Sequence, residues 1–166
     1  MAYLKESEYQ RRKATNFLVV HCSAWNPETR TQFTGVEDIR EYHIKKNGWK
    51  DIGYHYVIRR DGTRELGRPT WAVGAHVEGE NWQSLGICLV GGVDDAGQPA
   101  NNFTPEQMTT LEHALVVLYQ QYYGRAKVVG HHDFDGVKKA CPSFDAKGWW
   151  VPIGAALDKA AGRGRE

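Results

Sequence analysis

The stretch Phe17-Leu18-Val19-Val20-His21-Cys22 decides the fold, because it is a short, β-branched apolar run that ends at polar residues. Such a run predicts a buried strand. The run Leu85-Gly86-Ile87-Cys88-Leu89-Val90 predicts a second, central strand, which Gly91-Gly92 stops. Val128-Val129 predicts a short strand that leads directly into His131. We expect these three runs to lie in one β-sheet.

A β-hairpin is predicted in the part of the sequence that separates the first two of these strands. The segment Tyr54-His55-Tyr56-Val57-Ile58-Arg59 alternates like a strand, and Asp61-Gly62 turns the chain back into Thr63-Arg64-Glu65-Leu66. An Asp-Gly pair between two such segments is a strong signal for a tight turn.

Three helices are predicted around the strands. Thr34-Gly35-Val36-Glu37 fits a capping box, and the helix that it opens is expected to end near Gly48. Thr104-Pro105-Glu106-Gln107 combines a cap, a first-turn proline and a capping glutamine. An apolar stripe at helical spacing follows, made of Met108, Leu111, Leu115, Leu118 and Tyr122. A last short helix is expected over residues 152–161.

Because strands and helices alternate along the chain, the predicted fold class is α/β: a single domain with a central mixed β-sheet flanked by helices. The length of 166 residues fits one domain. Residues 1–15 are polar and charged and end in Arg11-Arg12-Lys13. We therefore expect an extended N-terminal arm, followed by a domain of residues 16–166.

Composition excludes several classes of protein. The 21 basic residues are nearly cancelled by 20 acidic ones, so the net charge of +1 lacks the basic excess typical of a nucleic-acid binder. No run approaches the ~20 apolar residues that span a bilayer, and the N-terminus lacks the apolar stretch of a secretory signal. We expect a protein that is made in the cytoplasm and does not insert into membranes.

The cysteines suggest reduced thiols. Cys22, Cys88 and Cys141 cannot all pair within the chain, and three cysteines are too few for a disulfide framework. One of them is therefore free to act as a metal ligand or as a nucleophile.

Three potential metal ligands lie where predicted strands end or shortly after. His21 closes the first strand, His131 follows the strand after the long helix, and Cys141 lies beyond it. Two imidazoles and a thiolate can hold Zn²⁺ with a fourth position open to water, whose pKa falls to about 7. The spacing does not match the HExxH or CxxC patterns, and Cys141 could instead be a nucleophile with a histidine partner. These residues alone leave both a zinc hydrolase and a cysteine hydrolase open.

Short motifs spread over most of the chain resemble one enzyme family. They are Val20-His21-Cys22-Ser23-Ala24, Gly53-Tyr54-His55-Tyr56-Val57-Ile58, Arg60-Asp61-Gly62-Thr63, Gly74-Ala75-His76, Asn81, Ser84-Leu85-Gly86-Ile87, Gly130-His131-His132-Asp133 and Ala140-Cys141-Pro142-Ser143-Phe144-Asp145. In this order, from about residue 16 to residue 150, they resemble the zinc N-acetylmuramoyl-L-alanine amidases of the phage-lysozyme type, which share a fold with the peptidoglycan recognition proteins. The resemblance implies that residues 16–166 form an amidase domain. Its reaction would be hydrolysis of the bond between the muramic acid lactyl group and the first L-alanine of bacterial peptidoglycan.

The resemblance also implies a ligand set. His21, His131 and Cys141 would hold one Zn²⁺ per chain, because His131 matches the first residue of the family's histidine motif. His132 would then be a structural neighbour.

Two catalytic roles follow from the same resemblance. Tyr54 matches the family tyrosine beside the metal, where a phenol can hydrogen-bond a water molecule or help to move its proton. Lys139 matches the family lysine aimed at the scissile carbonyl oxygen, where a cation stabilises an oxyanion. The neighbouring Lys138 leaves the choice between the two lysines open. From strand periodicity alone, Tyr54 would share one strand face with Tyr56 and Ile58.

Further polar residues have weaker assignments. His76, Asn81 and Ser84 match family positions that line the substrate groove, although each could instead fix a loop. Cys22 is expected to face away from the site as an inert core thiol, because side chains alternate along a strand. His55 is expected to be structural.

The expected biology is that of a phage endolysin. It would accumulate in the host cytoplasm until lysis and then reach the periplasm and the cell wall, and we expect a monomer. Members of the recognition branch keep the groove and lose the metal, but the presence of Cys141 with both histidines favours catalysis. Some phage members also bind and restrain the phage RNA polymerase, and residues 1–15 are the segment expected to make such a contact.

Overall fold

Strand β1, Phe17–Cys22, lies inside the sheet in the computed structural model, which describes residues 4–31 and 34–164. Its two neighbours, β4 (Ser84–Leu89) and β5 (Lys127–Gly130), both run parallel to it. Parallel strands are covered on both faces and form nearly continuous apolar runs. This burial explains why the three strands could be recognised in the sequence.

The predicted hairpin forms β2 (Tyr56–Ile58) and β3 (Arg64–Leu66), which pair antiparallel, while β2 runs parallel to β4. Within the described residues the strand order is β3-β2-β4-β1-β5. The predicted mixed sheet is therefore confirmed. Strand β2 is shorter than predicted, because Tyr54 and His55 lie before its first residue.

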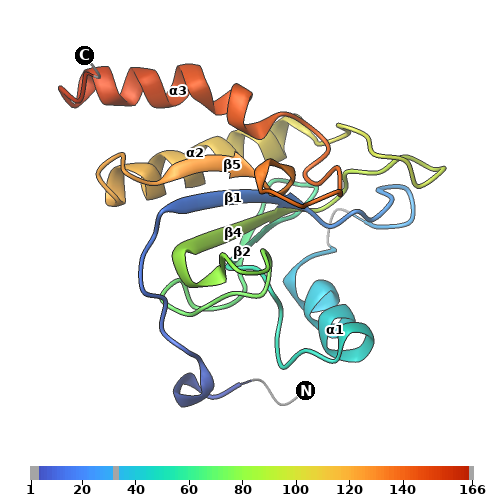
Figure 1. Cartoon of the computed structure of the whole chain (residues 1–166). Coiled ribbons are helices and arrows are strands. Elements are labelled where there is room, and N and C mark those ends of the chain that lie inside the picture. The colour runs from blue at the N-terminus through green and yellow to red at the C-terminus, as the bar shows by residue number, and fades with distance from the viewer. Residues whose placement is uncertain (1–3, 32–33, 165–166) are drawn as a thin grey trace.

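Helices cover both faces of the sheet. They are α1 (Val36–Asn47), α2 (Pro105–Gln121) and α3 (Ala146–Ala160), with short 3₁₀ turns η1 (Glu6–Glu8), η2 (Asn81–Gln83) and η3 (His131–Asp133). Figure 1 shows α2 and α3 along one face, with α1 on the other. Among the described residues, no helix is long and apolar enough to cross a membrane.

Alternation along β1 sorts its side chains between the two faces. Leu18 and Val20 are fully buried against α2 and α3, whereas Val19 belongs to a smaller cluster with Val77 on the opposite face. His21 has the same parity as Val19, so its side chain points away from α2 and α3.

Helix α2 begins as predicted. The Oγ1 atom of Thr104 accepts the backbone N–H of Gln107 at 3.1 Å, and the Oε1 atom of Gln107 accepts the backbone N–H of Thr104 at 3.1 Å. The same Gln107 amide also donates to the carbonyl oxygens of Ile58 and Val90. Because Ile58 ends β2 and Val90 directly follows β4, the cap also ties α2 to the sheet.

Helix α1 begins one residue later than predicted. Its N-cap is Gly35 rather than Thr34, and the Asp38 carboxylate accepts the Gly35 N–H at 2.9 Å. Glu37, the expected capping residue, forms an ion pair with Arg40 instead. The predicted end is confirmed, because Gly48 has a left-handed backbone with φ of 69°.

Helix α3 is longer than predicted. It begins at Ala146, where the Asp145 carboxylate accepts the backbone N–H of Gly148 at 2.8 Å, and it contains Pro152 in its interior. An interior proline costs a helix about 3 kcal/mol. Burial of Trp150 against the core offsets this cost, and the sequence pattern could not show that packing.

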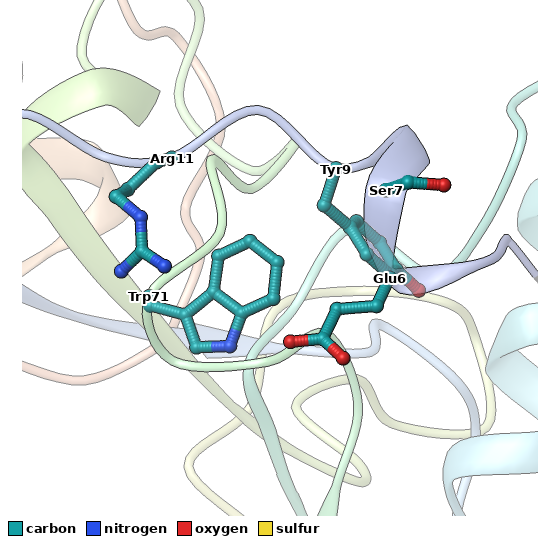
Figure 2. Close-up of a pocket in the computed structure, with 5 residues that line it drawn as sticks. All are labelled: Glu6, Ser7, Tyr9, Arg11 and Trp71. Atoms are coloured by element: carbon teal, nitrogen blue, oxygen red, sulfur yellow. The ribbon is translucent and has the colours of Figure 1, made fainter.

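The N-terminal segment consists of η1 followed by extended chain, and it packs on the residues that precede β4. The backbone of Arg11 forms an antiparallel bridge with Ala72, and the N–H of Val73 donates to the carbonyl oxygen of Gln10 at 2.7 Å. Figure 2 shows Arg11 over Trp71, with the guanidinium carbon 4.9 Å from the ring centroid. The boundary between arm and domain at residue 16 stays a prediction.

Arg12 fastens this segment more firmly than Arg11 does. Its guanidinium donates twice to the carbonyl oxygen of Thr70, at 2.6 and 2.9 Å, and also to the Ala14 carbonyl and the Thr15 hydroxyl. Hydrogen bonds from a charged group contribute more to stability than neutral ones.

We expect Arg12→Ala to lower the free energy of unfolding by about 2–3 kcal/mol, because it removes several charge-assisted hydrogen bonds. Arg11→Ala is the matched control, and it should cost only about 0.5–1 kcal/mol, the usual contribution of an exposed cation–π contact. Urea unfolding followed by circular dichroism measures both. Equal losses in the two variants would contradict this assignment.

Candidate metal centre

Two histidines meet at one edge of the sheet because of the register between β1 and β5. Val20 lies opposite Gly130, so the next residues, His21 and His131, leave the parallel pair side by side. Their ring centroids are 4.6 Å apart. This edge is formed by the carboxyl ends of the parallel strands, where α/β folds place their sites.

Cys141 reaches the same edge from the loop after η3. The backbone N–H of His132 donates to the carbonyl oxygen of Cys141 at 2.9 Å, and its ring Nδ1 lies 3.2 Å from the carbonyl oxygen of Ala140. These bonds bring the Sγ atom of Cys141 to 3.7 Å from the Nδ1 atom of His21. His132 thus has the structural role that the sequence predicted.

His21, His131 and Cys141 together form a candidate metal site, because their ligand atoms all lie within 4.8 Å of one another. Burial lowers the pKa of His21 well below its ordinary value. Burial and then the charge of Lys139 also lower the pKa of His131. Both rings are therefore neutral near neutral pH, and neutral imidazole is the form that binds a metal.

Cys22 lies closer to this site than predicted. It is buried, but its backbone N–H donates to the Sγ atom of Cys141 at 3.2 Å, and the two thiols share a hydrogen bond. That bond lowers the pKa of Cys22 to about 7 and, together with burial, raises the pKa of Cys141. The prediction of an inert thiol was wrong, because the loop of Cys141 folds over the last residue of β1.

Tyr54 lies beside His21, with ring centroids 5.1 Å apart. It packs with the cluster on the α1 side, whereas Tyr56 and Ile58 belong to the cluster under α2. The shared face predicted for these three residues was wrong, because the strand begins only at Tyr56. Burial and the neighbouring Cys88 thiol raise the pKa of Tyr54 well above its ordinary value, so the phenol keeps its proton.

Lys139 lies on the loop that carries Cys141, and its side chain is exposed. After burial and the neighbouring histidines, its positive charge contributes to the lowered pKa of His21. It is the second cause of the lowered pKa of His131. Its ammonium group therefore acts on both imidazoles, which favours Lys139 over Lys138.

His76, Asn81 and Ser84 lie behind His21 as a hydrogen-bonded group. His21 Nε2 is 2.9 Å from His76 Nδ1, and His76 Nε2 is 3.3 Å from the Ser84 hydroxyl. Asn81 Oδ1 accepts the backbone N–H groups of His76 and Val77. His76 is 8% exposed and Ser84 is fully buried. Contact with substrate stays a prediction for these residues, and their hydrogen bonds favour a role inside the protein.

Two further buried histidines are structural anchors. His55 Nε2 lies 2.8 Å from the carbonyl oxygen of Ala72, its Nδ1 accepts the Gly86 N–H at 3.0 Å, and burial lowers its pKa to about 3. The Nδ1 atom of His43 accepts the Gly53 N–H at 3.0 Å, and burial lowers its pKa to about 4. The structural role predicted for His55 is confirmed.

Two neutral imidazoles and a thiol at the carboxyl ends of parallel strands are typical of a metal-dependent hydrolase. A sequence profile of the N-acetylmuramoyl-L-alanine amidase family matches residues 11–144. The chain belongs to this family, and the resemblance inferred from the motifs is confirmed.

Known relatives agree in sequence and in fold. The endolysin of Escherichia phage T7 is 49% identical over 143 residues, which are 86% of this chain and 90% of the relative. The solved endolysin amidase LysCS from Clostridium intestinale URNW matches with a TM-score of 0.72 at 30% identity, over 95% of this chain and 93% of that one. Drosophila PGRP-LB matches with a TM-score of 0.66 at 21% identity, over 87% of this chain and 84% of that one, which shows the shared fold.

Cys141→Ser should weaken Zn²⁺ binding by more than the ~10–100-fold that loss of an outer hydrogen-bond partner costs, because a hydroxyl is a poor zinc ligand. Cys22→Ala is the matched control, since it removes the neighbouring thiol but keeps the backbone N–H that donates to Cys141. Its change in affinity should be smaller, at most the ~10–100-fold of an outer hydrogen-bond partner, because the Cys22 thiol hydrogen-bonds the Cys141 sulfur but is not a ligand. Competition with a colorimetric chelator measures both, and a serine variant with unchanged affinity would contradict the site.

Proposed function

We propose that this amidase is a zinc-dependent phage endolysin. Its reaction would be hydrolysis of the amide bond between the lactyl group of muramic acid and the first L-alanine of the peptidoglycan stem peptide. The observation that carries the proposal is the cluster of His21, His131 and Cys141 in a chain of the N-acetylmuramoyl-L-alanine amidase family. The similarity to the T7 endolysin supports the phage setting.

The donor set suits one Zn²⁺ per chain. Imidazole nitrogen and thiolate sulfur are preferred zinc ligands, whereas magnesium and calcium select oxygen. Three protein ligands leave room for water or substrate, as in catalytic zinc sites. When bound, zinc supplies Lewis acidity that polarises a carbonyl group and lowers the pKa of a water molecule. The backbone N–H of Cys22 supports the thiolate form of Cys141, because it donates to the sulfur.

We assign Tyr54 to donating a hydrogen bond beside the metal ligands. Its raised pKa keeps the hydroxyl protonated, so the phenol donates a hydrogen bond and is a poor base. A donor at this position can orient the attacking water or contact the substrate carbonyl. The 5.1 Å between the ring centroids of Tyr54 and His21 supports this assignment.

We assign Lys139 to the carbonyl oxygen of the scissile amide. Attack on an amide places negative charge on that oxygen, and a fixed cation stabilises the resulting tetrahedral intermediate. The effect of the Lys139 charge on both His21 and His131 supports its proximity to the reacting group.

Two alternative functions have less support. A cysteine hydrolase would pair Cys141 with one histidine as its base, whereas Cys141 lies in one cluster with both His21 and His131, the arrangement of three metal ligands. A recognition module without catalysis would lose a metal ligand, whereas all three candidate ligands are present together.

The expected setting is the host cytoplasm until lysis, and then the periplasm and cell wall, with the protein acting as a monomer. Restraint of a phage RNA polymerase stays a prediction. Because Arg12 fastens the N-terminal segment to the domain, deletion of residues 1–15 would also disturb the amidase. Substitution of exposed residues such as Lys5 and Lys13 is therefore the cleaner pull-down experiment.

Digestion of purified peptidoglycan tests the proposed reaction. We expect new L-alanine amino termini without new reducing ends, loss of the activity in chelator, and recovery when Zn²⁺ is added. Amine labelling and a reducing-sugar assay, run in parallel, measure the two products. New reducing ends would identify a glycosidase, and activity that survives complete removal of zinc would favour a cysteine hydrolase.

Lys139→Ala should lower kcat by about 100-fold, the usual effect of removing one oxyanion-stabilising group. Its Zn²⁺ stoichiometry should not change, because the lysine is not a ligand. Lys138→Ala is the matched control and should keep nearly full activity. If Lys138→Ala had the larger effect, the assignment of the two lysines would be reversed.

A further inference from the structure

A chain of hydrogen bonds connects His21 to the backbone through two side chains. The Ser84 hydroxyl donates to the carbonyl oxygen of Glu80 at 2.8 Å. Ser84 Oγ lies 3.3 Å from His76 Nε2, and His76 Nδ1 lies 2.9 Å from His21 Nε2. At the far end, His21 Nδ1 faces the sulfur of Cys141 at 3.7 Å.

The direction of each bond follows from the first. A carbonyl oxygen can only accept, so Ser84 gives its single proton to Glu80 and accepts from the Nε2–H of His76. The neutral ring of His76 carries one proton, so its Nδ1 atom is an acceptor. His21 must then donate from Nε2, and its Nδ1 atom keeps a free lone pair on the side of Cys141.

The backbone leaves a slot for the His76 ring. A Cβ atom at Gly86 would lie 2.7 Å from His76 Cγ, and one at Gly74 would lie 2.6 Å from His76 Cδ2. Neither glycine has a positive φ, so these positions need glycine for space. The Asn81 amide holds the backbone of His76 from outside the slot. The ring is thereby fixed where its Nδ1 atom meets His21.

We propose that His76 is a positioning residue that accepts the Nε2 proton of His21 and thereby keeps the His21 Nδ1 lone pair directed at the metal. The inference rests on the proposed zinc function. An outer hydrogen bond of this kind orients a metal-binding histidine and raises its basicity. Ser84 anchors the arrangement, because it fixes which nitrogen of His76 carries the proton. His76 and Ser84, which were expected to contact substrate, thus support the metal ligand His21 from the side opposite Cys141.

The test compares the Zn²⁺ affinities of His76→Phe and His76→Asn with that of the wild type, by competition with a chelator. Phenylalanine fills the slot but cannot accept a hydrogen bond, so affinity should fall about 10–100-fold. Asparagine Oδ1 can take the place of Nδ1, so this variant should recover most of the loss. His113→Phe, on an exposed position of α2, is the control. Unchanged affinity in His76→Phe, or equal losses in both His76 variants, would overturn the proposal.

A second measurement needs no variant. Long-range ¹H–¹⁵N correlation spectra of the metal-free wild type report which ring nitrogen carries the proton. Protons on Nε2 of both His21 and His76 support the proposal, and a proton on Nδ1 of His21 overturns it. Failure of the zinc function can be told apart from failure of the His76 proposal. A wild-type protein that binds no Zn²⁺ contradicts the zinc function. Tight wild-type binding with unaffected variants contradicts only the role of His76.

Discussion

Parallel hydrogen bonding between β1 and β5 sets Val20 opposite Gly130, and the site depends on that register. Shifting β5 by one residue would turn His131 to the other face, because side chains alternate along a strand. The same strand β1 is fixed on its other side by β4, with His21 opposite Cys88. Burial of the strands under α2 and α3 (Figure 1) is what holds this register. The hydrophobic core and the position of the imidazoles are therefore consequences of one arrangement.

Burial also decides the chemistry of the histidines. Removing an imidazole from water disfavours its charged form, and His21, His55 and His76 are all nearly or fully buried. Their neutral rings can accept as well as donate, so they connect to one another and to backbone groups in defined directions. A site of exposed histidines would lack this order, because water could satisfy either nitrogen. The same burial that keeps the ligands ready for a metal thus also supports the hydrogen-bond chain behind His21.

Much of this site was predictable from sequence, and the errors have identifiable causes. His21 and His131 were candidates because each lies at the end of an apolar strand. The resemblance to the amidase family then selected them, with His131 in place of His132, and the cluster that forms agrees with that choice. Cys22 was misjudged because alternation describes a strand and not the loop that folds over its end. The strand face expected for Tyr54 from periodicity was wrong for a similar reason, since the alternation was extended beyond the first residue of β2. The bond between His21 and His76 joins segments far apart in sequence, and no local pattern signals it.

The sequence by itself determined the α/β class, the three buried strands, the capped helix α2 and the family, because these depend on local apolar patterns and ordered short motifs. Tertiary structure decided the start of α3, where the packing of Trp150 outweighs an interior proline. It also decided that residues 4–15 lie against the domain and that Cys22 meets Cys141. Each of these outcomes depends on contacts between distant segments. Such contacts form only when the sheet has brought those segments together, so no window of sequence contains them.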